Sequence, residues 1–118
     1  MRFMTLYKPG NETNVPPTAE EMARMGALIG EMAGAGVLLA ADGLQPSATG
    51  ARVRLGGNGF SITDGPFTEA KELIAGFAIL QVPSKAEAIE WTKRFLTVAG
   101  GGESEIREMH DEPAFPPQ

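Results

Sequence analysis

The residues with the clearest potential for chemistry form the run Asp64-Gly65-Pro66-Phe67, which is soon followed by Lys71. An Asp held beside a cleft can act as a general base or as an acceptor for a ligand. A lysine close to Asp64 would lower the pKa of its carboxyl group and keep it ionised. The same run also suits a turn, in which the Asp caps amides, the Gly takes an unusual backbone angle and the Pro fixes the next angle. Turns outnumber active sites among such motifs, so we favour the structural interpretation of Asp64.

Few other residues suggest a reaction. The chain contains one histidine, His110, and no cysteine, so a Ser–His–Asp arrangement, a thiolate nucleophile and a Cys-ligated zinc are not indicated. His110 is followed by Asp111 and Glu112, which is not a recognised metal-ligand spacing, and we expect neither a metal nor a cofactor. Arg52 and Arg54 could face an anionic ligand, although a solvated strand face is the simpler interpretation.

Length and charge limit the class of protein. At 118 residues the chain fits one domain. Its net charge of −5, with the Lys and Arg residues scattered, argues against nucleic-acid binding, which requires a basic face. Residues 1–8 lack the features of a signal peptide, and no apolar run is long enough to span a bilayer. We therefore expect a cytoplasmic protein without membrane contact, which the lack of cysteine also fits.

The elements that must position these residues follow from apolar periodicity. Strands are predicted at residues 2–8, 37–41, 73–82 and 105–109, and a hairpin is predicted at residues 52–55 and 60–63 around a glycine-rich turn. Two helices begin at Thr18 and Ser84, and Glu21 and Glu87 complete a capping box at each start. This order predicts an α+β fold, namely a ferredoxin-like antiparallel sheet with two helices on one face and a β-hairpin insertion.

The same pattern predicts which surfaces pack. Apolar sets share one face of their element: Met22, Met25, Ile29 and Met32 in the first helix, Ala88, Trp91, Thr92, Phe95 and Leu96 in the second, and Val53, Leu55, Phe60 and Ile62 in the hairpin. The opposite face of the hairpin is expected to be solvated. Residues 73–82 are apolar on both faces, whereas both helices would cover the same face of the sheet. We therefore expect a second copy of the chain to cover the other face, which gives a homodimer.

The segment 64–72, together with Gly76-Phe77 and the earlier turn Gly43-Leu44-Gln45-Pro46, resembles the DGPF branch of the YCII-related family. The resemblance covers nearly the whole chain, and we assign residues 1–110 to the domain and residues 111–118 to an irregular tail. It implies a ferredoxin-like fold of the dimeric α/β-barrel type, with a cleft near the dimer interface. The resemblance also implies that some relatives use a His–Asp pair and that one branch performs dehalogenation-type chemistry. DGPF members are often encoded beside extracytoplasmic-function sigma factors.

Three functional hypotheses follow. The leading one is a dimer that binds a small molecule in a cleft lined by the DGPF segment, with turnover left open. The second is an acid–base enzyme that uses Asp64 as its general base, although the first helix carries Met22, Met25 and Leu28 where relatives can carry a histidine. The third is a regulatory partner of an extracytoplasmic-function sigma factor. The candidate ligand-binding residues are Asp64, Gly65, Pro66, Phe67, Lys71 and Tyr7.

Overall fold

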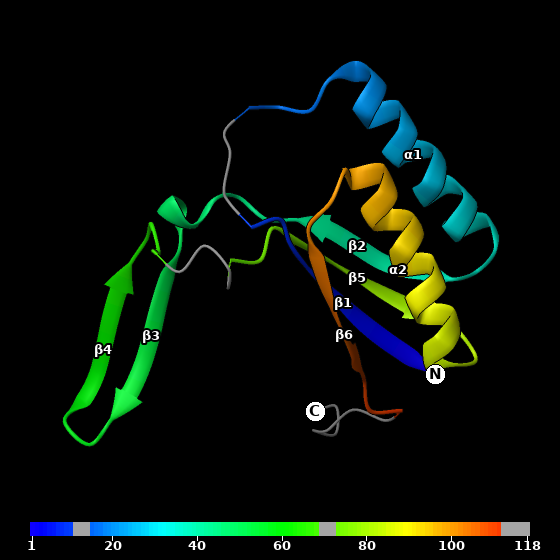
Figure 1. Ribbon diagram of the computed structural model, residues 1–118. Helices are drawn as coiled ribbons and strands as arrows, with labels where there is room; N and C mark the ends of the chain where they lie inside the picture. Colours follow the sequence, from blue (N-terminus) through cyan, green and yellow to red (C-terminus); the bar gives the residue numbers. More distant parts are fainter. Residues whose placement is uncertain (11–14, 69–72, 112–118) are drawn as a thin grey trace.

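A computed structural model describes residues 1–10, 15–68 and 73–111 of the chain. Along the chain the elements are β1 (Arg2–Lys8), α1 (Ala19–Gly34), β2 (Leu38–Gly43), the 3₁₀ turn η1 (Ser47–Thr49), β3 (Ala51–Gly56), β4 (Gly59–Asp64), β5 (Gly76–Gln81), α2 (Lys85–Ala99) and β6 (Glu103–Glu108) (Figure 1). The predicted tail at residues 111–118 lies outside these ranges except for its first residue. No helix in the described part of the chain is long and apolar enough to cross a bilayer.

The main sheet has four strands in the order β2-β5-β1-β6, and each neighbouring pair is antiparallel. Both helices pack on one face of this sheet (Figure 1). Strands β1 and β5 lie at the centre, as expected when two β-α-β units interleave in a ferredoxin-like fold. The predicted fold class is confirmed, including the two helices on one face and the inserted hairpin, which forms a two-stranded sheet of its own.

Side-chain caps begin both helices. The Thr18 hydroxyl accepts a hydrogen bond from the Glu21 amide at 3.1 Å, and the Glu21 carboxylate accepts one from the Thr18 amide at 3.3 Å, so the first capping box is confirmed. The Ser84 hydroxyl accepts a hydrogen bond from the Glu87 amide at 3.2 Å, but only this half of the second box is formed. α2 ends at Gly100, whose left-handed backbone (φ 89°) favours glycine.

The core consists of two apolar clusters between the helices and the sheet. One joins Phe3, Val82 and Ala88, and the other joins Leu28, Met32 and Leu80, with Trp91 packed against both. The predicted stripe of α1 is therefore rotated from its expected position. Met22 is 61% exposed and Ile29 is 40% exposed, because the first turns of α1 extend past the sheet (Figure 1) and the strip that contacts it contains Met25, Leu28 and Met32.

The strand predicted at residues 73–82 is shorter in the structure. β5 begins at Gly76, so Leu73, Ile74 and Ala75 precede it. The Ala75 backbone still forms hydrogen bonds with the backbones of Tyr7 and Leu44. Leu73 is buried while Ile74 is exposed, so the alternation continues into the segment before the strand. This continuing alternation explains why the pattern predicted too early a start.

The hairpin of β3 and β4 stands away from the main sheet on the side that the helices leave open (Figure 1). Its predicted pairing is confirmed, with Val53 opposite Ile62 and Leu55 opposite Phe60. The expectation that only one face would be solvated is wrong, because every residue of both strands is exposed. Apart from their pairing with each other, neither strand makes more than incidental contact with another described element. The physical reason is distance, since the hairpin does not fold back onto its own sheet.

Candidate functional site

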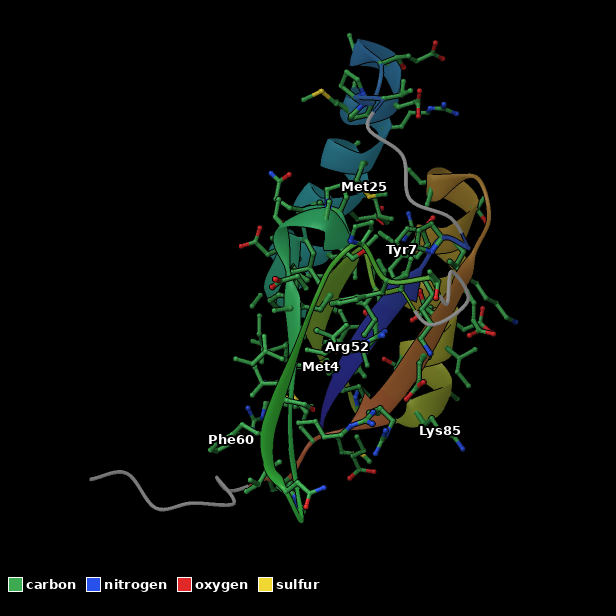
Figure 2. The ribbon with its side chains drawn as sticks, turned by 90° about the vertical axis from the view of Figure 1, so that its left-hand side faces the viewer. Met4, Tyr7, Met25, Arg52, Phe60 and Lys85 are labelled. Atoms are coloured by element: carbon green, nitrogen blue, oxygen red, sulfur yellow. The ribbon has the colours of Figure 1, made fainter. Side chains whose placement is uncertain are left out.

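Among the described residues, a cavity of about 300 Å³ lies between the helices and the sheet. Its wall is largely apolar and comes from five elements. The lining residues are Thr5 and Tyr7 of β1; Met25, Leu28, Ile29 and Met32 of α1; Leu38, Ala41, Asp42 and Gly43 of β2; Ala75, which precedes β5, with Gly76, Phe77, Ala78 and Leu80 of β5; and Trp91, Thr92 and Phe95 of α2. Figure 2 shows Tyr7 and Met25, two residues of this wall, at the same end of the molecule.

The polar groups of this wall are already partly engaged. The Tyr7 hydroxyl donates to the Gly101 carbonyl at 3.1 Å, and its ring meets Phe95 edge-on with 5.1 Å between the ring centroids. The Thr92 hydroxyl donates to the Ala88 carbonyl at 2.8 Å. Each hydroxyl therefore retains acceptor capacity while its proton is used within the protein. The cavity offers a ligand aromatic and apolar contact with a few hydrogen-bond acceptors.

Asp42 contributes to the same wall from the edge strand β2. In the antiparallel register Asp42 is opposite Phe77, and Phe77 is opposite Leu6, so these side chains belong to one face of the sheet. That face is the one turned away from the helices, because Phe3, Thr5 and Tyr7 occupy the helix side of β1. The Asp42 carboxylate accepts a hydrogen bond from the Gly43 amide at 3.0 Å. Asp42 therefore borders the cavity through its strand without directing its carboxylate inside.

The DGPF segment lies elsewhere, at the base of the hairpin. Asp64 is the last residue of β4 and pairs with Ala51. The Gly65 amide donates to the Gly50 carbonyl at 2.9 Å, and the Phe67 amide donates to the Ser47 hydroxyl at 3.0 Å. The turn is thus held by hydrogen bonds to Ser47 and Gly50.

Gly65 itself is required by a close approach of two backbones. A Cβ at this position would lie 1.6 Å from the Ser47 carbonyl oxygen, closer than any real contact. The backbone of Gly65 is not in the left-handed region, so the expected unusual angle is not the reason for glycine here. The peptide bond from Gly65 to Pro66 is cis.

A second, shallower cavity of about 370 Å³ lies beside this turn. Phe67 and Arg52 both line it, and the Arg52 guanidinium carbon sits 4.0 Å from the centroid of the Phe67 ring. This is a cation–π distance. The simpler expectation for Arg52, a fully solvated strand face, is therefore incomplete, because its guanidinium is stacked on an aromatic ring.

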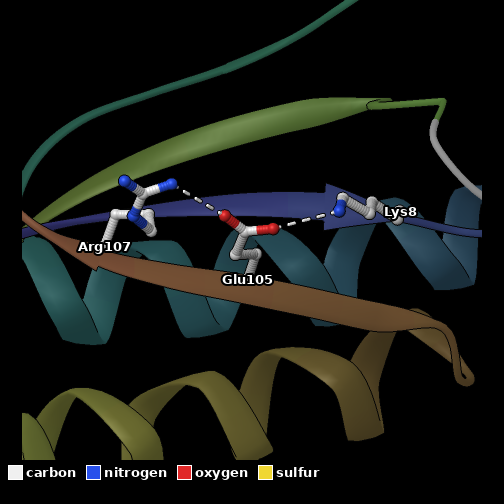
Figure 3. Close-up of polar contacts among 3 residues, drawn as sticks. All are labelled: Lys8, Glu105 and Arg107. Carbon is white, nitrogen blue, oxygen red and sulfur yellow. Dashed lines mark hydrogen bonds and ion pairs between the residues drawn. The ribbon is translucent and has the colours of Figure 1, made fainter.

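A third feature is an ion cluster on the sheet face opposite the helices. The Lys8 ammonium lies 3.1 Å from one carboxylate oxygen of Glu105, and the Arg107 guanidinium lies 3.2 Å from the other (Figure 3). The hydrogen bond from Lys8, and then that from Arg107, lowers the pKa of the Glu105 carboxyl group below its ordinary value. The cluster keeps a charged border along β6 beside the apolar centre of the open face.

Comparison with known proteins assigns the family. A model of the YCII-related domain matches residues 1–110. The chain belongs to the YCII-related family. No curated protein matches the sequence significantly. Among solved structures, the chain is similar to 5-chloro-2-hydroxyhydroquinone dehydrochlorinase from Burkholderia phenoliruptrix in complex with 2,5-dihydroxybenzoquinone, with 14% identity, a TM-score of 0.47 and coverage of 93% of this chain and 94% of that chain. A likeness of this strength carries no argument about activity.

In this YCII-related domain the sequence-predicted candidates do not converge on one cavity. Tyr7 lines the cavity under the helices, whereas Phe67 lines the one beside the hairpin. Asp64 is exposed at the end of β4. Gly65 and Pro66 form the connection after it, and Lys71 lies outside the described residues.

His110 is also remote from a catalytic arrangement in the described YCII-related fold. It follows β6, it is exposed, and its carbonyl accepts a hydrogen bond from Arg2 at 2.7 Å. Trp91, Phe95 and Met32 line the cavity under the helices, whereas the sequence pattern assigned them only to core packing. The one available signal was the concentration of aromatic side chains on the inner face of the second helix.

Proposed function

We propose that this YCII-related protein binds a small, mainly apolar molecule that contains a ring, in the cavity between the helices and the sheet. The observation that carries the proposal is a largely apolar cavity of about 300 Å³ with Tyr7, Trp91 and Phe95 in its wall. Small-molecule sites are typically concave, apolar and largely preformed, and this volume lies at their lower end, which suits one or two rings. The thioethers of Met25 and Met32 add an adaptable surface for such a ligand.

The experiment uses N-phenyl-1-naphthylamine, an apolar probe whose fluorescence rises in a dry site. Ala41 and Ala40 are exposed neighbours on β2, but only Ala41 lines the cavity. Ala41→Leu should narrow the cavity and weaken saturable probe binding about ten-fold or more, whereas Ala40→Leu should leave it within about two-fold. Circular dichroism checks that both variants keep the fold. Probe binding that does not saturate, or that is equal in the two variants, would contradict the proposal.

The acid–base alternative, with Asp64 as the base beside the DGPF segment, is tested by a different substitution. Asp64→Asn leaves the strand end nearly isosteric but removes the basic carboxylate. If the helix-side cavity is the site, probe affinity in this variant should stay within about two-fold of the parent protein. Loss of a measured turnover with intact fold and intact probe binding would instead favour Asp64 as a catalytic group.

We also propose a homodimer through the sheet face opposite the helices. By register, Met4, Leu6, Phe77 and Ile79 share this face, and the helices leave it open (Figure 1). An apolar sheet face normally needs a second layer. Light scattering should give a dimer for the parent protein and a monomer for Ile79→Glu. The regulatory role with a sigma factor stays a prediction from the family resemblance.

A further inference from the structure

The hairpin of β3 and β4 presents an apolar face that nothing in the described chain covers. Val53, Leu55, Phe60 and Ile62 form its two cross-strand pairs and are 67%, 68%, 74% and 68% exposed. Arg54 and Ser61 form a pair on the other face. Figure 2 shows the hairpin in front of the sheet, and Figure 1, seen from the side, shows the hairpin at the left, apart from the sheet.

Such a hairpin needs a partner surface to be stable. An isolated two-stranded hairpin is marginal in water, and stability normally requires a third strand or packing against another element. Here the alternation places four large apolar side chains together on one side, which is the pattern of a strand pair with a buried face. Because the strands make only incidental contact with the other elements of the described chain, another molecule is the natural source of that cover.

The size of the chain favours a second copy as that molecule. The radius of gyration is 16.3 Å, against roughly 13.5 Å for a compact domain of this length. The accessible surface is 8534 Å², against roughly 6,200 Å² for a compact monomer of this mass. A standard interface buries about 800 Å² on each partner, so the excess is sufficient for one.

Charge gives an independent reason for the same occupant. Residues 51–64 contain Arg52, Arg54 and one acidic residue, Asp64, which gives a net +1. Because the whole chain has a net charge of −5, the remainder of the chain carries a net charge of −6. A weakly basic arm on an acidic body is complementary to the body of another copy, and a two-fold axis makes the contact reciprocal.

We propose that the hairpin is a dimerisation arm whose apolar face, formed by Val53, Leu55, Phe60 and Ile62, packs against the second copy. The inference rests on the proposed homodimer and deepens it, because it adds a second contact beyond the open sheet face. In the dimer each copy receives the arm of the other, and the apolar face becomes buried while Arg54 and Ser61 stay solvated.

The test uses matched charges on neighbouring residues of β4. Phe60→Glu places a carboxylate on the apolar face, and Ser61→Glu places the same group on the opposite face. The parent protein and Ser61→Glu should scatter light as dimers of about 25 kDa, twice the 12.5 kDa of one chain. Phe60→Glu should raise the dimer dissociation constant about ten-fold or more, as expected for an aromatic anchor.

The outcomes separate the arm from the dimer itself. If Ile79→Glu dissociates the dimer while Phe60→Glu leaves its dissociation constant unchanged, the sheet-face dimer stands and the arm proposal fails. If the parent protein is a monomer, both fail, and the apolar face is left to a protein of another kind, such as a regulator.

A second measurement does not depend on how the charged variants fold. The chain has no cysteine, so a single thiol can report burial directly. Ile62→Cys and Ser61→Cys place thiols on the apolar and the polar face. Reaction with dithiobis-nitrobenzoate should be about ten-fold slower for Ile62→Cys at dimer concentrations, and the two rates should converge on dilution. Equal rates at dimer concentrations would overturn the proposal.

Discussion

At the scale of single residues, Gly65 is the position most tightly constrained by its surroundings. Its amide donates to the Gly50 carbonyl, and the space where a side chain would begin is occupied by the Ser47 carbonyl. Any other residue would push apart the two backbone segments that fix the base of the hairpin. The constraint is a tertiary contact, since the whole hairpin separates Ser47 from Gly65 along the sequence.

Gly65→Ala should therefore lower the free energy of unfolding by about 2 kcal/mol or more, because a backbone segment must move to admit the methyl group. Gly57→Ala is the control, because nothing lies within 4 Å of a Cβ at Gly57 and its φ is not left-handed. The control should change the free energy of unfolding by less than about 0.5 kcal/mol. Urea titrations of both variants measure the difference, and equal values would show that the close approach is relieved without cost.

The ion cluster at Glu105 makes a prediction about pH. Its pKa is lowered from an ordinary 4.5, chiefly by the hydrogen bond from Lys8, so the folded state favours the carboxylate. The resulting stabilisation is present above pH 4.5 and is lost as the pH falls through the lowered folded-state pKa. Glu105→Gln should unfold at lower urea than the parent protein at about pH 7 and at nearly the same urea at about pH 3.

Glu108→Gln provides the control for this experiment. Glu108 is on the same strand, is exposed, and has no ion pair within the described ranges. Its difference from the parent protein should not share the pH dependence of Glu105→Gln. A gap between Glu105→Gln and the parent protein that is unchanged between the two pH values would contradict a role for the ionised carboxylate.

At the scale of elements, the start of α2 matters because this helix reaches both core clusters through Trp91. Ser84 caps it by accepting the Glu87 amide. Ser84→Ala should cost about 1 kcal/mol of the free energy of unfolding, whereas Ser84→Asp, which retains an acceptor oxygen, should be nearly neutral. Thermal unfolding followed by circular dichroism measures both. Equal losses in the two variants would show that the hydroxyl matters for something other than the cap.

Element types, their order and their caps could be predicted from the sequence because each depends on neighbouring residues. The strip of α1 that is buried could not, since the stripe from Met22 to Met32 and the strip through Leu28 differ by only a small rotation of the helix. The cavity could not be predicted either, because it is the space that side chains of five elements leave between them. The motif of the DGPF segment identified the family. It did not identify a single site, because Phe67 and Tyr7 line different cavities.

At the scale of the whole molecule, the proposed homodimer would link stability to protein concentration. When only the folded chain associates, dilution favours unfolding by mass action. The melting temperature of the parent protein should therefore rise with protein concentration, while that of Ile79→Glu should stay constant. Differential scanning calorimetry over a hundred-fold range of protein concentration can measure this trend. Such a range changes the free energy of association by about 2.7 kcal/mol. A concentration-independent melting temperature in the parent protein would contradict a dimer of folded chains.

The hydrogen bond between Gly65 and Gly50 means that the hairpin begins and ends at adjacent points of the chain. The entropy of closing a loop depends only weakly on its length once its ends are fixed together. The core can thus exchange the fourteen residues of the hairpin for a shorter or longer segment with little effect on its own sheet. If the hairpin is the proposed dimerisation arm, changing it at this junction would alter subunit association while leaving the cavity between the helices and the sheet intact.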